Sequence, residues 1–499
     1  MRRVQNRAPD QELTCLDLFA GCGGFSLGLH RAGWQVKASI DFDPKAVEVY
    51  RANFPDTENI LCRDLTKFSP AELQKLTGLT EVDMIVGGPP CQGFSQVRQR
   101  DGANHGGRLI EDPRRRLYEQ YFQYVDKFRP KLFVMENVLG IRSAAGGRYF
   151  DAVHATARDH GYRVIGTVID AWKFGVPQKR RRQFIIGTRL DLPMYFRTET
   201  IASMVGTRDF KLGHAIGDLP LLPADSGAER AEYDLVLRRR HIEDPLAAWY
   251  LKHVVEIGRS EELTSHVARP HSDRDLRDFD RIPEGETSKE VLRRGGVLEF
   301  PYDRSSFYDR YTRQSRTDYC STIVAHLSRD GLMFIHPTQR RSLTAREAAR
   351  VQTFPDWFSF PVPRTHQYRV IGNTVPPVVS WAVANAAPGF KASVTTPQDC
   401  RSASALVHVI TTQEIRRRPR LPFSRPPLRQ EAMSLVPTLL SARMAWPSLS
   451  AARNSCDFLD LAVRRRSQRD TRPAPTGRLS RSSVKPFSRC LQAGSPLPL

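Results

Sequence analysis

Short apolar runs bounded by glycine, proline or charged residues recur along the first part of the chain, and they indicate buried strands. We expect strands at residues 13–19, 36–40, 59–62, 82–86, 131–135, 162–169 and 183–187. Helical patterns are predicted between several of them, at residues 25–32, 44–50 and 117–128. This alternation predicts an α/β fold, in which ligands bind beyond the carboxyl ends of the strands.

The pattern changes twice further along the chain. Periodicity weakens over 188–335, where we expect an inserted domain of mostly irregular structure. Helices return at 343–352, with Thr344 as the N-cap, and at 376–387. Residues 390–499 are rich in Ser, Pro and Arg without any period, so we expect disorder there. The predicted parts are an arm at 1–12, a first domain at 13–187, the insert at 188–335, a return to the first domain at 336–389 and the tail at 390–499.

Composition narrows the class of protein. A chain of 499 residues predicts two or three domains, and 40% hydrophobic residues suit a soluble globular protein. No apolar run reaches the roughly 18 residues that a membrane span needs, and the basic N-terminus lacks the apolar core of a signal peptide. The eight cysteines form no CxxC pair, which argues against a structural zinc site or a disulfide framework and favours a reducing cytosol.

The net charge of +21 suggests a polyanionic partner, but it is unevenly distributed. Residues 401–499 hold 17 Arg and 1 Lys against 3 Asp and 2 Glu, a net charge of +13. The first 400 residues therefore carry +8, which supports nucleic-acid binding by the folded part only modestly. The tail is either a basic arm for DNA or a non-native extension, and we favour the extension.

The stretch from Gly87 to Ser95 presents Cys91 on a stiff loop. Glycines and prolines end the preceding strand because proline cannot continue a hydrogen-bonded ladder. A lone cysteine is more often a buried structural residue, but this position at a strand end favours a nucleophile. Glu136 ends another predicted strand at the same sheet edge and is the candidate general acid. The polar loop at 96–116 is then either a lid or a disordered surface segment.

A glycine-rich turn follows the first strand and predicts a ligand held close to the backbone. Asp41 lies about 20 residues further on, at a strand end, where an acid accepts hydrogen bonds from a ribose. Its alternative role is a helix N-cap, which Asp43 fills better because it directly precedes Pro44. Phe42 suits stacking on adenine, and Asp64 also follows a strand, although a surface charge is the alternative. The turn does not match a phosphate-binding loop, so a nucleoside cofactor without pyrophosphate fits better.

Taken together, these motifs resemble the bacterial-type DNA (cytosine-5) methyltransferases. The resemblance covers residues 13–388, in the order of that family. It rests on the segments Asp17–Gly24, Gly88–Ser95, Glu136–Val138, Gln178–Arg182 and Gln367–Val375. The resemblance implies a Rossmann-like, S-adenosylmethionine-dependent methyltransferase sheet with an inserted target-recognition domain.

The family chemistry gives each motif a role. Cytosine C5 is too weak a nucleophile, so Cys91 would add to C6 and make C5 reactive. Glu136 would donate a proton to N3 and accept from the N4 amine. Arg182 would contact the cytosine O2, and Arg180 would support the site. The C5 proton then leaves to a base and the thiolate is eliminated.

The implied cofactor is S-adenosylmethionine, without a metal. The residues that would bind it lie in the glycine turn, at the next strand ends and near the C-terminus of the matched region: Phe19, Ala20, Gly21, Gly23, Gly24, Asp41, Phe42, Asp64, Pro89, Asn373 and Val375. Asp41 stands where many relatives have Glu, which gives a shorter reach to the ribose.

The implied substrate is a cytosine flipped out of double-stranded DNA, since C6 is shielded in a duplex. The expected DNA-binding residues are Gln92, Ser95, Arg98 and Thr322, with the insert reading bases. We expect a cytoplasmic, nucleoid-associated monomer from a restriction–modification system, partnered by an endonuclease, or an orphan enzyme. A tRNA cytosine methyltransferase is an alternative that the long insert disfavours. A catalytically dead DNA-binding relative is another, which intact Cys91, Glu136 and Arg182 oppose.

Overall fold

The computed structural model describes residues 12–90, 117–190, 208–260, 262–300 and 309–386, all within one compact unit. The strands are β1 Leu13–Leu18, β2 Trp34–Asp41, β3 Asn59–Cys62, β4 Met84–Gly87, β5 Leu132–Asn137, β6 Arg163–Asp170, β7 Arg181–Thr188, β8 Arg230–Ala231 and β9 Leu263–Thr264. The α-helices are α1 Gly24–Arg31, α2 Pro44–Asn53, α3 Pro70–Thr77, α5 Leu117–Phe128, α6 Arg148–Asp159, α8 Leu212–Ile216, α9 Leu235–His241, α10 Pro245–Tyr250, α11 Asp273–Arg281, α12 Ser288–Arg293, α13 Ala345–Val351, α14 Arg364–Asn373 and α15 Pro377–Asn385. Within these described ranges, no helix is both long and apolar enough to cross a bilayer.

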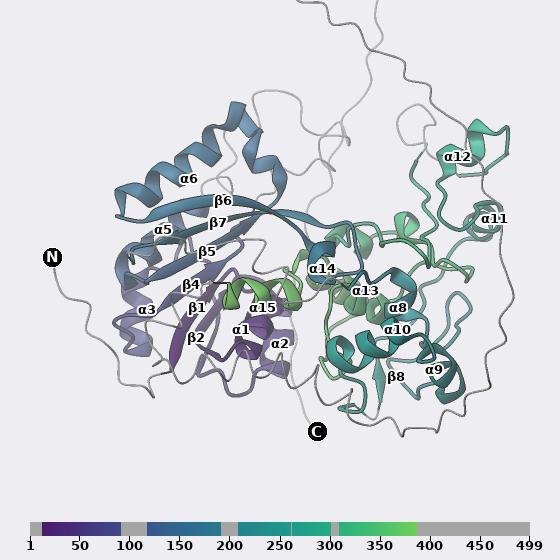
Figure 1. Cartoon of the computed structure of the whole chain (residues 1–499), viewed down its shortest axis with the longest axis horizontal. Coiled ribbons are helices and arrows are strands. Elements are labelled where there is room, and N and C mark those ends of the chain that lie inside the picture. The colour runs from purple at the N-terminus through teal and green to yellow at the C-terminus, as the bar shows by residue number, and fades with distance from the viewer. Residues whose placement is uncertain (1–11, 91–116, 191–207, 261, 301–308, 387–499) are drawn as a thin grey trace, which may run out of the picture. The chain divides into compact units, whose positions relative to one another are not determined.

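Seven strands form one sheet in the order β3-β2-β1-β4-β5-β7-β6 (Figure 1). The strands from β3 to β5 are parallel, whereas β7 runs antiparallel to both β5 and β6. Strand order reverses between β1 and β4, which is where doubly wound sheets bind ligands. The predicted α/β, Rossmann-like sheet is therefore confirmed.

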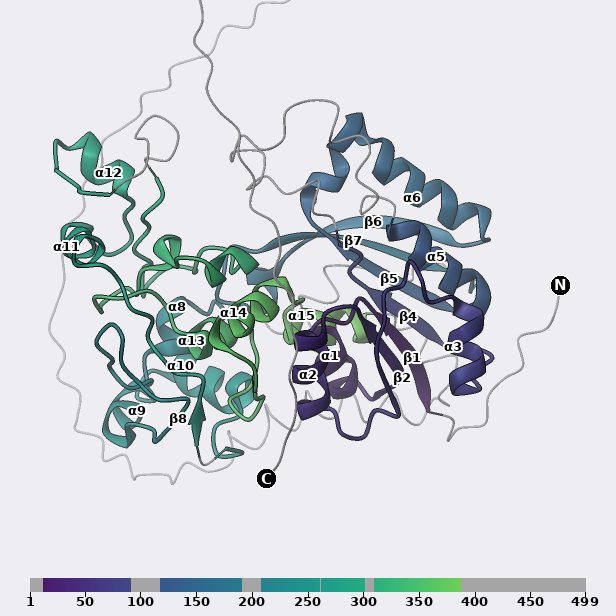
Figure 2. The same ribbon diagram turned by 180° about the vertical axis from the view of Figure 1, so that it is seen from behind.

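Helices cover both faces of this sheet (Figures 1 and 2). On one face, α1 and α15 pack on apolar side chains of β1, β2, β4, β5 and β7. On the other face, α3, α5 and α6 pack against side chains from alternate positions of the same strands. Side chains alternate between the two faces along each strand, so continuous apolar runs become strands buried on both sides.

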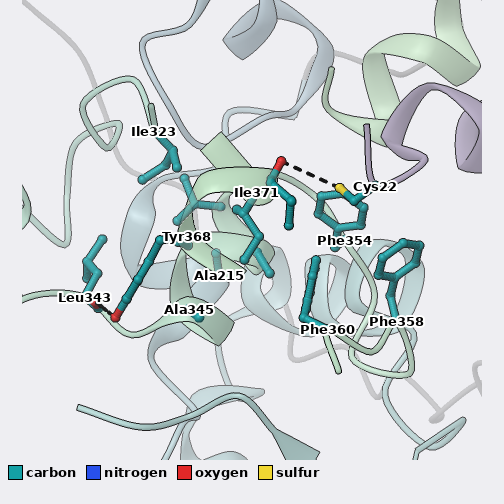
Figure 3. Packing of buried hydrophobic residues seen from close by; sticks show 14 of the residues in the cluster. Cys22, Ala215, Ile323, Leu343, Ala345, Phe354, Phe358, Phe360, Tyr368 and Ile371 are labelled. Atoms are coloured by element: carbon teal, nitrogen blue, oxygen red, sulfur yellow. Dashed lines mark hydrogen bonds between the residues drawn. The ribbon is translucent and has the colours of Figure 1, made fainter. Parts of the chain in front are cut away.

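A third hydrophobic cluster joins the first part of the chain to the insert and the return segment, as Figure 3 shows. Cys22 of the glycine turn, Ala215 and Ile323 of the insert and Tyr368 of α14 are all buried in it. The Cys22 thiol contacts the Val370 carbonyl at 3.6 Å, and the Tyr368 hydroxyl donates to the Leu343 carbonyl at 2.9 Å. The insert is thus anchored on the same core as the segment that returns to the sheet.

The insert is built of short pieces, as expected from its weak periodicity. Its two strands, β8 and β9, are two residues each, and its helices are short. The Thr344–Glu347 capping box predicted for α13 is present. Asp43 is the N-cap of α2, with Pro44 in the first turn.

The structure differs from the predicted pattern in three details. β5 continues through Glu136 and Asn137 rather than ending before them, and β7 already begins at Arg181. Helices α3, α6 and α14 were not predicted. The division into the five predicted parts stays a prediction, and the tail at 390–499 lies outside the described residues.

Candidate active site

The loop that follows β4 is described as far as Pro90. Gly87 pairs with Met135 of β5, so the loop leaves the sheet beside the last two residues of β5. The buried Asn137 amide donates to the Pro89 carbonyl at 3.3 Å, which holds the start of the loop on β5. Cys91, Gln92, Ser95 and Arg98 lie outside the described residues.

Glu136 and Arg182 form an ion pair at this edge. Their Oε1 and Nε atoms are 3.0 Å apart, and the side chains are only 12% and 17% exposed. The pair follows from the antiparallel register: Glu136 is opposite Phe184, and Arg182 lies two residues earlier on the same face. Burial lowers the pKa of Arg182 and pairing with Glu136 opposes that shift. The predicted acid and the predicted O2-contacting arginine are therefore neighbours.

The absence of a side chain at Gly88 leaves room for the Glu136 carboxylate. A Cβ atom at Gly88 would lie 3.3 Å from Glu136 Oε2, tighter than ordinary contact. The residue between β4 and the two prolines therefore lies directly beside the acid. The loop that carries Cys91 leaves the sheet from this point.

Arg180 is completely enclosed and makes structural contacts. Its guanidinium donates to the Ile323 carbonyl at 2.9 Å and to the Thr374 carbonyl at 2.7 Å. Burial strongly lowers its pKa. Arg180 thus ties the chain before β7 to the end of the insert and to the return segment. Its supporting role in the chemistry stays a prediction.

Thr322 lies next to the same segment. Its hydroxyl donates to the Lys179 carbonyl, and Gln178 forms a parallel bridge with Cys320. The Gln178 side chain accepts from the Ile323 amide at 3.1 Å and donates to the Gln352 side chain at 2.7 Å. These contacts bring Thr322 to the arginine-rich segment, whereas its predicted contact with DNA stays a prediction.

The glycine turn after β1 forms the second half of the site. Phe19, Gly21 and Gly23 all have positive φ angles, of 58°, 58° and 90°. At Gly23 a Cβ would lie 2.4 Å from the Phe54 ring, and at Gly24 it would lie 1.9 Å from the Thr374 hydroxyl. The turn is therefore pressed against α2 and the return segment, and only glycine fits at these two positions.

Asp41 fixes this turn from the end of β2. Its Oδ2 accepts from the Gly21 amide at 2.8 Å, and its Oδ1 accepts from the Asp43 amide at 2.8 Å. Burial raises the pKa of Asp41, and the two amide hydrogen bonds oppose that shift. Each carboxylate oxygen has a further lone pair, so the group suits the ribose contact predicted for it.

Phe42 directly follows the end of β2, and Asp64 lies two residues beyond the end of the neighbouring strand β3. The Phe42 ring is 62% exposed, an unusual state for a large apolar side chain at the end of a buried strand. Asp64 is exposed, and hydrogen bonds from the amide and hydroxyl of Thr66 lower its pKa. An exposed ring and two carboxylates at adjacent strand ends suit a nucleoside: the ring offers a stacking face and the acids accept hydrogen bonds.

The return segment closes the turn from the other side. Asn373 is the last residue of α14 and is exposed, while Val375 is buried just before α15. Val375 contributes a carbonyl that a Cβ at Gly24 would approach to 2.6 Å. The residues predicted from Phe19 to Gly24, at Asp41 and at 373–375 therefore form one continuous corner.

Asp17 was not predicted as a site residue. It is buried in β1, where it accepts from the Ser26 hydroxyl at 2.6 Å, and the Tyr50 hydroxyl in turn donates to Ser26 at 2.7 Å. Burial raises the pKa of Asp17 to about 7. A single acid on an otherwise apolar strand was the available signal, since buried carboxyl groups need hydrogen-bond partners.

Asn137 was also not predicted as a site residue. The available signal was its position in the sequence, directly after the predicted acid Glu136. Among the residues that the structure describes, no group of three or more His, Cys, Asp or Glu side chains could hold a metal ion. The polar groups at this site are carboxylates, which accept hydrogen bonds, and backbone amides and arginines, which donate them.

Comparison with known proteins identifies the family and several relatives of this chain. The family model described as C-5 cytosine-specific DNA methylase matches residues 13–388. The chain is 34% identical over 388 residues to the Type II methyltransferase M.DdeI of Desulfomicrobium norvegicum, covering 74% of this chain and 88% of that relative. It is 32% identical over 377 residues to the Type II methyltransferase M.XorII of Xanthomonas oryzae pv. oryzae, covering 74% and 82%.

Among solved structures, a putative DNA modification methyltransferase encoded within a prophage (E. coli) superimposes with a TM-score of 0.57 at 24% identity. That superposition covers 76% of this chain and 99% of the other. At this identity the likeness speaks for the fold alone, and it agrees with the sheet order described above.

Proposed function

The chain belongs to the C-5 cytosine-specific DNA methylase family and is a DNA cytosine-5 methyltransferase, and from this premise we propose that it methylates a flipped-out cytosine in duplex DNA through a covalent adduct with Cys91. The observation that carries the proposal is the Glu136–Arg182 pair beside the loop that leads to Cys91. It puts an acid and a cation at the edge where the nucleophile would approach.

In this mechanism the Cys91 thiolate forms a bond to C6, which moves negative charge towards N3. Glu136 holds the N3 edge and supplies a proton there as the charge develops. Arg182 orients Glu136 through the ion pair and offers its remaining donors to the cytosine O2. After transfer to C5, the C5 proton leaves to a base, the C5–C6 double bond re-forms as the thiolate departs, and the N3 proton returns to Glu136.

S-adenosylmethionine would supply the methyl group. Asp41, Phe42 and Asp64 would hold its nucleoside, because an exposed aromatic ring can stack on adenine and carboxylates at the adjacent strand ends can accept from the ribose and the adenine amine. The turn from Phe19 to Gly24 would lie against it, and Pro89, Asn373 and Val375 would complete the pocket. No phosphate-binding loop is needed for this cofactor.

The relatives named Type II methyltransferases suggest the biological setting. We propose that the enzyme is the modification half of a restriction–modification pair or an orphan, acting as a monomer in the cytoplasm near the nucleoid. A cognate endonuclease would cut the same site. Residues 188–335 would read the target sequence, aided by Gln92, Ser95, Arg98 and Thr322, and bisulfite sequencing of DNA from expressing cells would identify it.

The covalent step is tested with DNA that contains 5-fluorocytosine, incubated with the enzyme and S-adenosylmethionine. Fluorine cannot leave C5 as a proton does, so a stable protein–DNA adduct should accumulate on a denaturing gel. Cys91→Ala should form none. Cys62→Ala is the matched control and should keep the adduct, because Cys62 is the one described cysteine that is not buried.

Two results would contradict the proposal: no adduct with the wild type, or an adduct that persists in Cys91→Ala. A parallel reaction with fluorinated tRNA separates the alternative substrate, since an adduct on tRNA but not on duplex DNA would overturn the DNA assignment.

A further inference from the structure

An ion pair joins the two distant segments that enclose the proposed cofactor pocket. Arg369 Nη2 lies 2.6 Å from Asp43 Oδ2, and the two residues are 326 positions apart in the chain. Arg369 is on α14, four residues before Asn373 and therefore about one turn away on the same helix face. Asp43 follows Asp41 and Phe42 directly. The pair thus connects the Asn373 side of the corner to the Asp41 side.

Asp43 transmits its position to Asp41 through the backbone. Its amide donates to Asp41 Oδ1, and the other oxygen of Asp41 accepts from the Gly21 amide. The Asp43 side chain also caps α2 by accepting from the Lys45 amide at 3.0 Å. A displacement of Asp43 would therefore move Asp41, the start of α2 and the glycine turn together.

Arg369 is itself held in place on α14. The same Nη2 atom donates to His366 Nδ1 at 2.9 Å, one helical turn earlier. The Asp43 side chain is 19% exposed and that of Arg369 is 40% exposed, so the pair is partly shielded from water. Partial burial makes such a pair stronger than a free surface pair, whose contribution is small.

We propose that Arg369 is a positioning residue for S-adenosylmethionine binding, which it serves by holding Asp43 and through it the Asp41–Phe42 corner against the return segment. It does not need to touch the cofactor. This inference rests on the proposed function, because it assumes that Asp41, Phe42 and Asn373 bind the nucleoside. It adds a residue outside the predicted cofactor set.

The test measures the binding and kinetic constants for S-adenosylmethionine and for DNA separately, on the full-length enzyme. For Arg369→Ala we expect the Kd and KM for S-adenosylmethionine to rise about three- to fivefold, the upper end of the effect that a partly exposed ion pair supports. The kcat at saturating cofactor and the KM for DNA should stay within about twofold. Lys45→Ala is the matched control. It removes the exposed Lys45–Glu48 pair of 2.7 Å on α2, the helix that Asp43 caps, and should change neither the Kd nor the KM for S-adenosylmethionine.

Asp43→Asn separates positioning from folding. Asparagine remains a good N-cap, so α2 keeps its start while the charge that pairs with Arg369 is lost. We expect the same rise in the Kd for S-adenosylmethionine as in Arg369→Ala, and no further rise in the double variant. This variant also serves if Arg369→Ala fails to fold.

Unchanged cofactor binding in both variants would overturn the inference. A fall in kcat and a rise in the KM for DNA as large as the loss of cofactor affinity would also overturn it, because that pattern marks general damage to the fold. Failure of the proposed function gives a different result, because the wild type itself would then not bind S-adenosylmethionine.

Discussion

Asp17 shows how one buried side chain makes the glycine turn sensitive to pH. It lies on β1, two residues before the turn begins at Phe19, and accepts a hydrogen bond from the Ser26 hydroxyl in the first turn of α1. In the unfolded chain its pKa is about 3.9. Burial raises the pKa to about 7 in the folded protein, so the folded state holds the proton over a range in which the unfolded state has lost it.

The stability contributed by the protonated form should therefore be complete below about pH 4 and lost as the pH rises towards about 7. In Asp17→Asn this titration is absent. The unfolding free energy of the wild type, minus that of Asp17→Asn, should fall by about 1.4 kcal/mol per pH unit across that window. Urea unfolding of both proteins at several pH values measures it, and a flat difference would contradict the expected titration.

At the residue scale, sequence predicted groups with a local signal and missed those defined by distant partners. Cys91, Asp41 and the glycines could be proposed as site residues because neighbouring residues in the sequence indicate strand ends and turns. The Glu136–Arg182 contact needed the reversed direction of β7, which no local pattern encodes. The pairing of Asp43 with Arg369 joins positions 326 residues apart and was equally hidden.

At the element scale, α1 and α15 pack unusually closely. A Cβ at Gly28 would lie 2.4 Å from the Trp381 amide and 2.5 Å from the Pro377 carbonyl. The Ser380 hydroxyl also bonds to the Gly24 carbonyl at 3.1 Å. Backbone lies against backbone here, so a side chain on α1 at this position has no room.

Gly28→Ala should therefore destabilise the protein, although alanine has a higher helix propensity than glycine. Alanine normally gains about 1 kcal/mol over glycine inside a helix. Overpacking against backbone atoms costs about 1–3 kcal/mol, and the contacts here are with rigid backbone, so we expect a net loss of about 1–2 kcal/mol in urea unfolding. A gain in stability would show that the two helices separate without cost.

The strands and most helices around the site were predictable as elements because each is long enough to carry its own period. Helix α3 carried a signal that was overlooked, since Ser69 and Glu72 form a capping box next to Pro70. Helix α6 begins after a glycine in the left-handed conformation without a side-chain cap, which gives little to recognise. The direction of β7 depends on packing between strands rather than on its residues.

At the scale of the whole molecule, buried ion pairs link the insert to the return segment. Arg350 of α13 is completely buried, and its guanidinium pairs with Asp218 of the insert and with Asp356, at 2.5 Å to Asp356 Oδ2. Pairing with Arg350 lowers the pKa of Asp356, although burial opposes it. Removing the arginine would leave two buried carboxylates with fewer cationic partners: Asp218 would keep Arg238 at 3.0 Å, and Asp356 would keep Arg346 at 3.8 Å.

Arg350→Met should cost about 3–5 kcal/mol of unfolding free energy, the penalty for a buried charge that loses its partner. Arg277→Met is the matched control, because Arg277 pairs with Glu299 at 2.6 Å on the surface. It should cost less than about 1 kcal/mol. Equal losses in the two variants, measured by urea unfolding, would show that burial does not decide the strength of these pairs.

The insert could be predicted to be irregular but not to be anchored in this way. Weak periodicity over 188–335 indicated short pieces, and the structure has them. Asp218 and Ala215 meet α13 across more than a hundred residues, and such contacts leave no trace in local sequence.

The divided construction of the proposed cofactor pocket also matters during protein synthesis. The ribosome releases Asp43 long before Arg369, and at about 5–20 residues per second the 326 intervening residues take roughly 16–65 s. Throughout that interval the emerging chain has the glycine turn but lacks the helix that closes on it. A cofactor that binds only when α14 has closed on the glycine turn can therefore stabilise only chains that include α14. Products truncated before α14 are not stabilised by the cofactor.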